Sequence, residues 1–203
     1  MTSSDPAAAA AWKLVLASAS PRRREILANA GFRFVVRPAE VDEAPRGVED
    51  PLEHVKRLAI EKAEAVALGA GEVVLAADTI VAVEGEILGK PSGTTEARKM
   101  LEKLSGRWHE VLTGVCLRHP GGRIVDAERT RVLFLPLAAQ EIDDYIASGE
   151  PMDKAGAYGI QGLASKFVRR IEGCYFNVVG LPVALVYRHL RSLGSPRAEP
   201  GVP

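Results

Sequence analysis

The stretch that decides the fold is Leu14-Val15-Leu16-Ala17-Ser18-Ala19-Ser20-Pro21-Arg22-Arg23-Arg24. It joins an apolar run to the start of a helix through a turn of small residues. The run predicts a strand at about 13–18. Ser20 is a good N-cap, and Pro21 suits the first helical position, so we expect a helix at about 21–30. Helix N-terminal amides with arginines beside them favour an anion such as phosphate. A solvated basic patch on an ordinary helix explains these residues equally well.

Strands and helices alternate in the first half of the chain, and hairpins follow in the second half. We expect further strands at about 32–36, 73–83, 87–88, 111–117, 124–135, 166–171 and 174–179. We expect further helices from a cap at Asp50 to near Gly69, and at about 97–104, 138–148 and 183–190. This order predicts an α/β fold with a mixed sheet.

The composition is that of an ordinary globular protein: 203 residues, 47% hydrophobic and 26% charged. We expect disordered tails at 1–11 and 195–203 and a single domain over 12–194. The formal net charge is zero, so nothing global favours a nucleic-acid-binding module.

Cys116 and Cys174 form neither a metal-binding spacing nor a disulfide framework. The N-terminus does not resemble a signal peptide, and no apolar run approaches the roughly 18 residues that span a bilayer. We therefore expect a cytoplasmic protein with no membrane partner.

Three charged residues are candidates for a functional site. Two of them interrupt apolar patterns, and the third follows a hairpin. Asp78 interrupts the apolar strand and must be paired, metal-bound or at the strand's end, because burying a lone charge is costly. Lys62 falls on the apolar face of its helix, where snorkelling is the ordinary explanation. Lys90 follows a hairpin, in a turn that could be merely exposed. Glu43 is a possible second carboxylate or a solvated loop residue.

The segment with the most candidate ligand-binding residues is Asp153-Lys154-Ala155-Gly156-Ala157-Tyr158-Gly159-Ile160-Gln161-Gly162. Its glycines permit close approach of a ligand to the backbone. Tyr158 offers a ring for base stacking, and Gln161 offers a donor and an acceptor to a base edge. A flexible connector is the alternative. Ser18 has no evident base partner, so a serine nucleophile is weakly supported.

Several segments together resemble the Maf family of nucleoside triphosphate pyrophosphatases. The matching pieces, in order, are Leu16-Ala17-Ser18-Ala19-Ser20-Pro21-Arg22-Arg23, Glu61-Lys62-Ala63, Ala77-Asp78-Thr79-Ile80-Val81, Gly89-Lys90-Pro91, Leu104-Ser105-Gly106, the segment from Asp153 to Gly162, and Val178-Val179-Gly180-Leu181-Pro182. The match runs from about residue 13 to 193, and several motifs in register are more specific than any one of them.

The resemblance implies a mixed, twisted sheet flanked by helices in two lobes with a central cleft, like the inosine triphosphate pyrophosphatases. It also implies cleavage between the α and β phosphates, a divalent metal cation (Mg²⁺ or Mn²⁺) and a homodimer. Carried over by motif, Asp78 is the catalytic carboxylate, and Arg22, Thr79 and Gln161 are linked to substrate choice. A glutamine at 161 resembles the branch that acts on dTTP and UTP. The branch that prefers 7-methyl-GTP typically has a glutamate there.

These expectations combine into one mechanism, in which Asp78, with the metal and Glu43 as a second ligand, activates a water for attack on the α-phosphorus. The substrate-binding residues are then Ser18, Arg22, Lys62, Thr79, Lys90, Lys154 and Gln161. Two alternatives remain open. One is an enzyme for modified or other nucleotides, such as 7-methyl-GTP or CTP. The other is a non-catalytic nucleotide sensor that regulates septum formation.

Overall fold

Strand β3 (Glu72–Val83) is the central strand of the computed structural model, which describes residues 12–44, 46–47 and 49–194. Within those residues the sheet has seven strands in the order β2-β1-β3-β5-β6-β7, and β4 also pairs with β3. The pairings of β1 with β2 and β3 are parallel, and the other pairings are antiparallel. The expected mixed sheet is therefore confirmed.

The other strands are β1 (Lys13–Leu16), β2 (Phe34–Val36), β4 (Glu86–Leu88), β5 (Trp108–His119), β6 (Gly122–Phe134) and β7 (Val168–Glu172). The helices are α1 (Pro21–Asn29), α2 (Pro51–Ala65), α3 (Thr94–Leu104), α4 (Ala139–Ala147), α5 (Tyr175–Val179) and α6 (Val183–Ser192). Short 3₁₀ turns span Glu150–Asp153, Ala155–Ala157 and Leu163–Phe167. No helix in the described part of the chain is long and apolar enough to cross a membrane. Both tails that the sequence predicts to be disordered lie outside the described residues.

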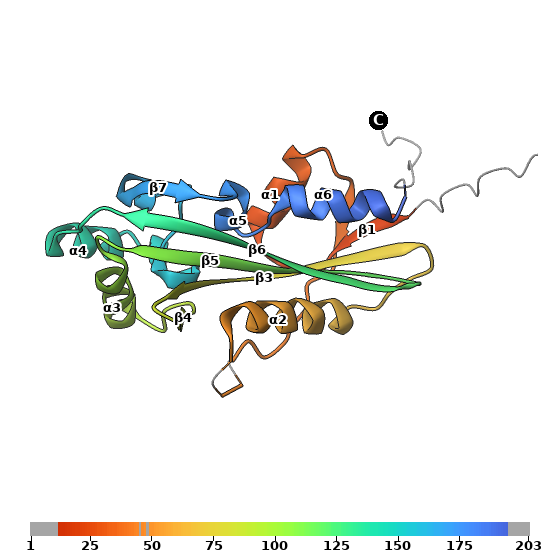
Figure 1. Cartoon of the computed structure of the whole chain (residues 1–203), viewed down its shortest axis with the longest axis horizontal. Coiled ribbons are helices and arrows are strands. Elements are labelled where there is room, and N and C mark those ends of the chain that lie inside the picture. Colours follow the sequence, from red (N-terminus) through yellow and green to blue (C-terminus); the bar gives the residue numbers. More distant parts are fainter. Residues whose placement is uncertain (1–11, 45, 48, 195–203) are drawn as a thin grey trace, which may run out of the picture.

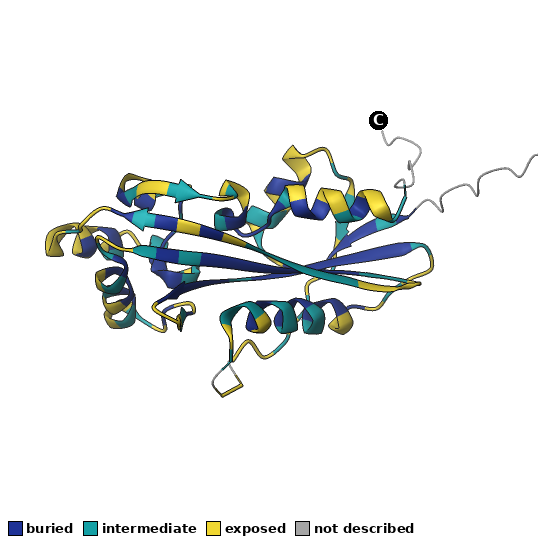
Figure 2. Ribbon diagram, in the orientation of Figure 1, coloured by how far each residue is buried: buried dark blue, intermediate teal, exposed yellow. Residues whose placement is uncertain are grey.

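Helices cover both faces of the sheet, with α2 on one face and α1, α5 and α6 on the other (Figure 1). Val74 and Ala76 of β3 pack in one apolar cluster with Ala59 and Ala63 of α2. The alternate β3 residues join the larger cluster on the opposite face, and β3 is buried along almost its whole length (Figure 2). Burial on both faces explains why β3 is a nearly continuous apolar run in the sequence.

The strand pairing along one edge of β3 is interrupted, and the gap lies beside the cavity described below. Strand β1 pairs with β3 only as far as Leu75, and β4 pairs only from Val81 onward. Strand β5 occupies the other edge throughout this stretch. Residues 76–80 of β3 therefore have no strand partner on the first edge within the described chain. Ser18 from the segment after β1 and Lys90 from the segment after β4 line one cavity with Asp78 and Thr79 of this stretch.

The predicted strand at 174–179 is wrong, because these residues form helix α5. Its Val178-Val179 pair favours a strand locally, but tertiary contacts of Asn177 prevail. The buried Asn177 amide donates to Val111 O at 2.9 Å and to Thr130 Oγ1 at 3.0 Å. The helix then ends at Gly180, whose φ of 125° favours glycine. Helix α2 also ends at Ala65, four residues before the predicted end near Gly69.

Candidate active site

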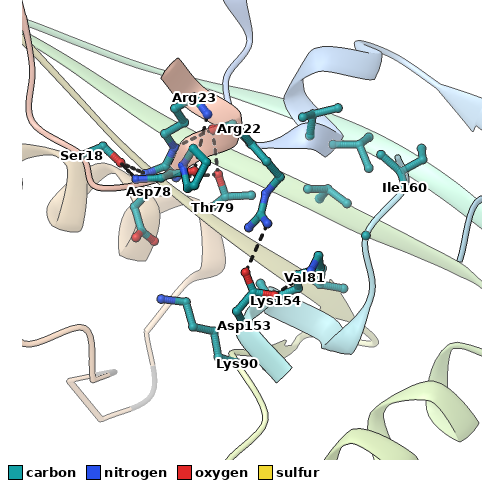
Figure 3. Close-up of a pocket in the computed structure, with 18 of the residues that line it drawn as sticks. Ser18, Arg22, Arg23, Asp78, Thr79, Val81, Lys90, Asp153, Lys154 and Ile160 are labelled. Atoms are coloured by element: carbon teal, nitrogen blue, oxygen red, sulfur yellow. Dashed lines mark hydrogen bonds and ion pairs between the residues drawn. The ribbon is translucent and has the colours of Figure 1, made fainter. Parts of the chain in front are cut away.

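A cavity of about 610 Å³ lies at the gap in the edge of β3. This volume is typical of a small-molecule site. All nine residues that the sequence singled out line it, and Figure 3 shows several of them. They are Ser18, Arg22, Glu43, Lys62, Asp78, Thr79, Lys90, Lys154 and Gln161. The structure thus gathers residues separated by up to 143 positions in the chain (161 minus 18), while their individual roles stay predictions.

Lys62 lies between two carboxylates at the α2 side of this cavity. Its Nζ is 2.6 Å from Asp78 Oδ1 and 2.6 Å from Glu43 Oε1. Lys62 and Asp78 are both buried, so each compensates the other's charge in a poorly solvated place. Strand alternation explains the pair, because Asp78 points to the same face as Val74 and Ala76, the face that α2 covers. The strand-end interpretation of Asp78 is therefore wrong, and so is snorkelling of Lys62.

Glu43 is the more exposed of the two carboxylates and comes from the loop that precedes α2. Burial alone would raise its pKa, but the hydrogen bond from Lys62 and the charges of Lys62, Lys90 and Arg23 together hold the pKa below its usual value. Lys90 Nζ lies 3.6 Å from Glu43 Oε2. Glu43 is therefore ionised at neutral pH.

The two carboxylates fit a divalent cation of the magnesium type. Such ions are commonly held by one or two carboxylates together with substrate phosphates. No group of three His, Cys, Asp or Glu side chains in the described residues could hold an ion by itself. Glu43 and Asp78 would therefore hold the metal with help from a phosphate ligand rather than as a closed protein site.

Arg23, which the sequence analysis did not assign to the site, forms a second polar cluster on the opposite face of β3. Its guanidinium donates to Gly180 O at 2.8 Å, to Thr79 Oγ1 at 3.1 Å and to Ser18 Oγ at 3.3 Å (Figure 3). Burial lowers the pKa of Arg23, while the charges of Asp78 and Glu43 raise it in part. The signal in the sequence was Ser20, whose hydroxyl caps the helix by accepting from Arg23 N, which places Arg23 in the first turn.

Arg22 reaches across the cavity to the opposite wall. Its Nη1 lies 3.3 Å from Asp153 Oδ2, and Lys154 Nζ lies 2.6 Å from Asp153 Oδ1 (Figure 3). Asp153, a residue to which the sequence assigned no role, therefore pairs with two predicted phosphate-binding cations. The Asp153 carboxylate is largely exposed in both pairs, so a phosphate group can displace it at small cost.

The remaining wall is apolar and carries Gln161 at its exposed rim. Val81, Val111 and Ile160 line this part of the cavity. Tyr158 touches the cavity, but the residue is only 5% exposed and its ring packs edge-on against Phe134, so the ring belongs to the core and does not project as a base-stacking platform. The arrangement places cations beside carboxylates at one side and an apolar surface at the other, which suits a phosphorylated ligand with a flat apolar part.

A family model for Maf-like proteins matches residues 13–193 of the chain. The chain belongs to the Maf family. Two relatives named dTTP/UTP pyrophosphatase, from Carboxydothermus hydrogenoformans and Koribacter versatilis, are 54% and 53% identical to it. These alignments cover 90% and 89% of this chain and 99% and 94% of the relatives. The resemblance stated from the motifs is thus confirmed.

Solved structures of Ham1 proteins share the fold of this Maf-family chain. The Staphylococcus aureus Ham1 protein matches with a TM-score of 0.50 at 16% identity, over 89% of this chain and 98% of its own. The Coxiella burnetii HAM1 protein matches with the same TM-score at 17% identity, over 89% of this chain and 99% of its own. At this identity the likeness extends to the fold alone, and it confirms the expected mixed α/β architecture.

Proposed function

We propose that the chain is a nucleoside triphosphate pyrophosphatase that converts dTTP and UTP to the nucleoside monophosphate and pyrophosphate. The observation that carries this proposal is the Glu43–Lys62–Asp78 cluster, which lies in the same cavity as Arg22, Lys90 and Lys154. The names of relatives about half identical over nine-tenths of the chain support the same activity and the same two substrates.

The cations divide the cavity into a reacting end and a phosphate-binding end. Lys62 holds Asp78 Oδ1, which leaves Oδ2 to accept a proton from the attacking water. Arg22, Lys90 and Lys154 bind the triphosphate and neutralise the charge that builds on the leaving pyrophosphate. Their ion pairs with Asp153 and Glu43 open as the phosphates arrive.

Glu43 and Asp78 would hold a divalent cation together with the substrate phosphates, and the ion would supply Lewis acidity and lower the pKa of water. The chain's own part is to fix the two carboxylates through Lys62 and to keep Arg23 anchored to Ser18 and Thr79. Gln161, at the rim, is the residue we assign to selection of the base.

Product analysis tests this proposal most directly. The purified protein is incubated with Mg²⁺ or Mn²⁺ and, separately, UTP, dTTP, CTP, GTP and 7-methyl-GTP. The expected products are UMP and dTMP with one equivalent of pyrophosphate, formed faster than the products of the other substrates. Release of orthophosphate and nucleoside diphosphate would contradict the proposed cleavage site. Tight nucleotide binding without turnover would favour a sensor instead.

A further inference from the structure

The loop that carries Gln161 is fastened at both ends by one pair of side chains. At its start, Gly159 N donates to Tyr145 Oη at 3.2 Å. At its end, Leu163 N donates to Glu150 Oε2 at 2.9 Å. Tyr145 Oη in turn donates to Glu150 Oε1 at 2.9 Å, so the pair links the two ends of the loop.

We call Tyr145 and Glu150 the support of the loop. Both glycines of the loop pack closely against Glu150 or against Lys154, which is bound to it. A Cβ on Gly162 would lie 2.3 Å from Glu150 Oε2, and a Cβ on Gly159 would lie 2.7 Å from Lys154 Cε. Lys154 is itself tied to the support, because its Nζ donates to Glu150 O at 2.7 Å. Any side chain at 159 or 162 would therefore push the loop off its support, which explains the glycines better than flexibility does.

Tyr145 is buried, and both oxygens of the Glu150 carboxylate accept hydrogen bonds. Tyr145 is 3% exposed, and its ring packs edge-on against Phe167. Burial and the hydrogen bond to Glu150 raise the pKa of Tyr145, so its hydroxyl stays protonated and remains a donor. Glu150 lines the cavity, but each of its oxygens accepts a hydrogen bond from Tyr145 or Leu163. It is thus directed to the loop rather than to a ligand.

We propose that Tyr145 and Glu150 are positioning residues that fix Gln161 for base selection. The inference rests on the proposed function, because it needs a nucleotide whose base reaches the rim of the cavity. Hydrogen bonds weaken steeply as distance and angle depart from their optimum. A shift of about 1 Å in the loop therefore removes discrimination between bases, while Arg22 and Lys90, which are not bound to Tyr145 or Glu150, keep their places at the phosphate end.

The test uses Tyr145→Phe and Glu150→Gln in the full chain. Phenylalanine keeps the packing and removes the hydroxyl, while glutamine keeps the shape and leaves one of the two donors without an acceptor. Glu141→Gln is the matched control, because Glu141 also accepts from a backbone amide, that of Ala138, but away from the cavity. Measurements are kcat and KM for UTP and CTP, with inhibition by inorganic tripolyphosphate as a probe of the phosphate end.

We expect both variants to lower the UTP-to-CTP ratio of kcat/KM by about fivefold to tenfold, the effect of one misplaced hydrogen bond, chiefly through a higher KM for UTP. Inhibition by tripolyphosphate should stay within about twofold of wild type, and Glu141→Gln should match wild type. An unchanged ratio, or an equal weakening of tripolyphosphate and UTP, would overturn the inference.

A failure of the proposed function itself would give a different experimental result. In that case wild type would not release UMP and pyrophosphate, and the comparison would pass to the binding of UMP and CMP measured by calorimetry. A wild-type preference for UMP that both variants abolish would still support the positioning role. A preference that both variants retain, or the absence of any preference in wild type, would overturn it.

Discussion

The Lys62 ammonium lies 2.6 Å from Asp78 Oδ1, and less than a tenth of either side chain is exposed. A buried ion pair of this kind is costly to break, because the remaining charge keeps its desolvation penalty without a partner. The pair joins α2 to β3 and so fixes both the helix and the carboxylate to which we assign the reaction. We therefore expect stability and catalysis to be coupled at Lys62.

Replacing Lys62 by methionine should destabilise the protein by about 3–5 kcal/mol, since Asp78 loses its partner in a poorly solvated place. Urea unfolding of wild type and Lys62→Met measures this change. The double variant Lys62→Met/Asp78→Asn should recover much of the lost stability while remaining inactive. Additive effects of the two single variants would show that the two residues do not interact energetically.

Asp78→Asn should lower kcat by at least about 10²-fold, the smallest effect typical of removing a general base, while UTP binding persists. Asparagine keeps the shape of the side chain but accepts no proton. Single-turnover kinetics and calorimetric titration with UTP separate the two effects. Asp144→Asn on the exposed face of α4 controls for loss of a carboxylate. Turnover near that of wild type would exclude Asp78 from the mechanism.

The sequence predicted most of the strands and helices, because these depend on local patterns. It predicted the residues of the cavity partly from such patterns and partly, as for Thr79, from the resemblance to the Maf family. Asp78 and Lys62 each break an apolar pattern, and that conflict marked them. Arg23 and Asp153 break no pattern, so no residue pattern distinguished them from the neighbouring Arg22 and Lys154. Their partners lie on other elements and appear only when the chain is folded.

The wrong prediction of a strand at 174–179 also arises from contacts with other elements that the sequence does not show. The apolar and β-branched residues there satisfy the pattern of a strand, and only the buried hydrogen bonds of Asn177 to β5 and β6 select a helix. The gap in the edge of β3 is likewise a property of pairing. It depends on where β1 ends and where β4 begins, two boundaries that sequence patterns place only within a few residues.

Asp153→Asn should lower the KM for UTP by up to about fivefold, with kcat unchanged. The carboxylate competes with phosphate for Arg22 and Lys154, and an ion pair whose carboxylate is largely exposed is worth at most about 1 kcal/mol. The advantage of the variant should shrink in high salt, where exposed charges are screened. Asp143→Asn is the control, since Asp143 pairs with Arg98 away from the cavity. A higher KM for Asp153→Asn would show that the carboxylate assists binding.

Gln161→Glu should lower kcat/KM for UTP and dTTP about tenfold relative to GTP and 7-methyl-GTP. A glutamine side chain offers both a donor and an acceptor, whereas an ionised glutamate only accepts, so one contact to a pyrimidine edge is lost. Gln140→Glu on α4 is the matched control, because it makes the same change on the exposed surface. Relative rates that stay the same in Gln161→Glu would remove Gln161 from base selection.

His109 should make the stability of the fold depend on pH between about 6.5 and 4. Burial lowers its pKa to about 4, against a backbone hydrogen bond that raises it, while the unfolded chain titrates near 6.5. Between these values the unfolded state binds a proton that the folded state does not, so stability falls as the pH falls. The loss reaches about 3 kcal/mol at pH 4 and then levels off for this group.

Urea unfolding at intervals from pH 7.5 to 4, compared between wild type and His109→Gln, isolates this contribution. Glutamine keeps a polar group opposite the Tyr158 hydroxyl, which lies 2.9 Å from His109 Nε2, but it does not titrate. The variant starts from a lower stability, so the slopes against pH are compared rather than the absolute values. A slope in His109→Gln as steep as that of wild type would assign the pH dependence to other groups.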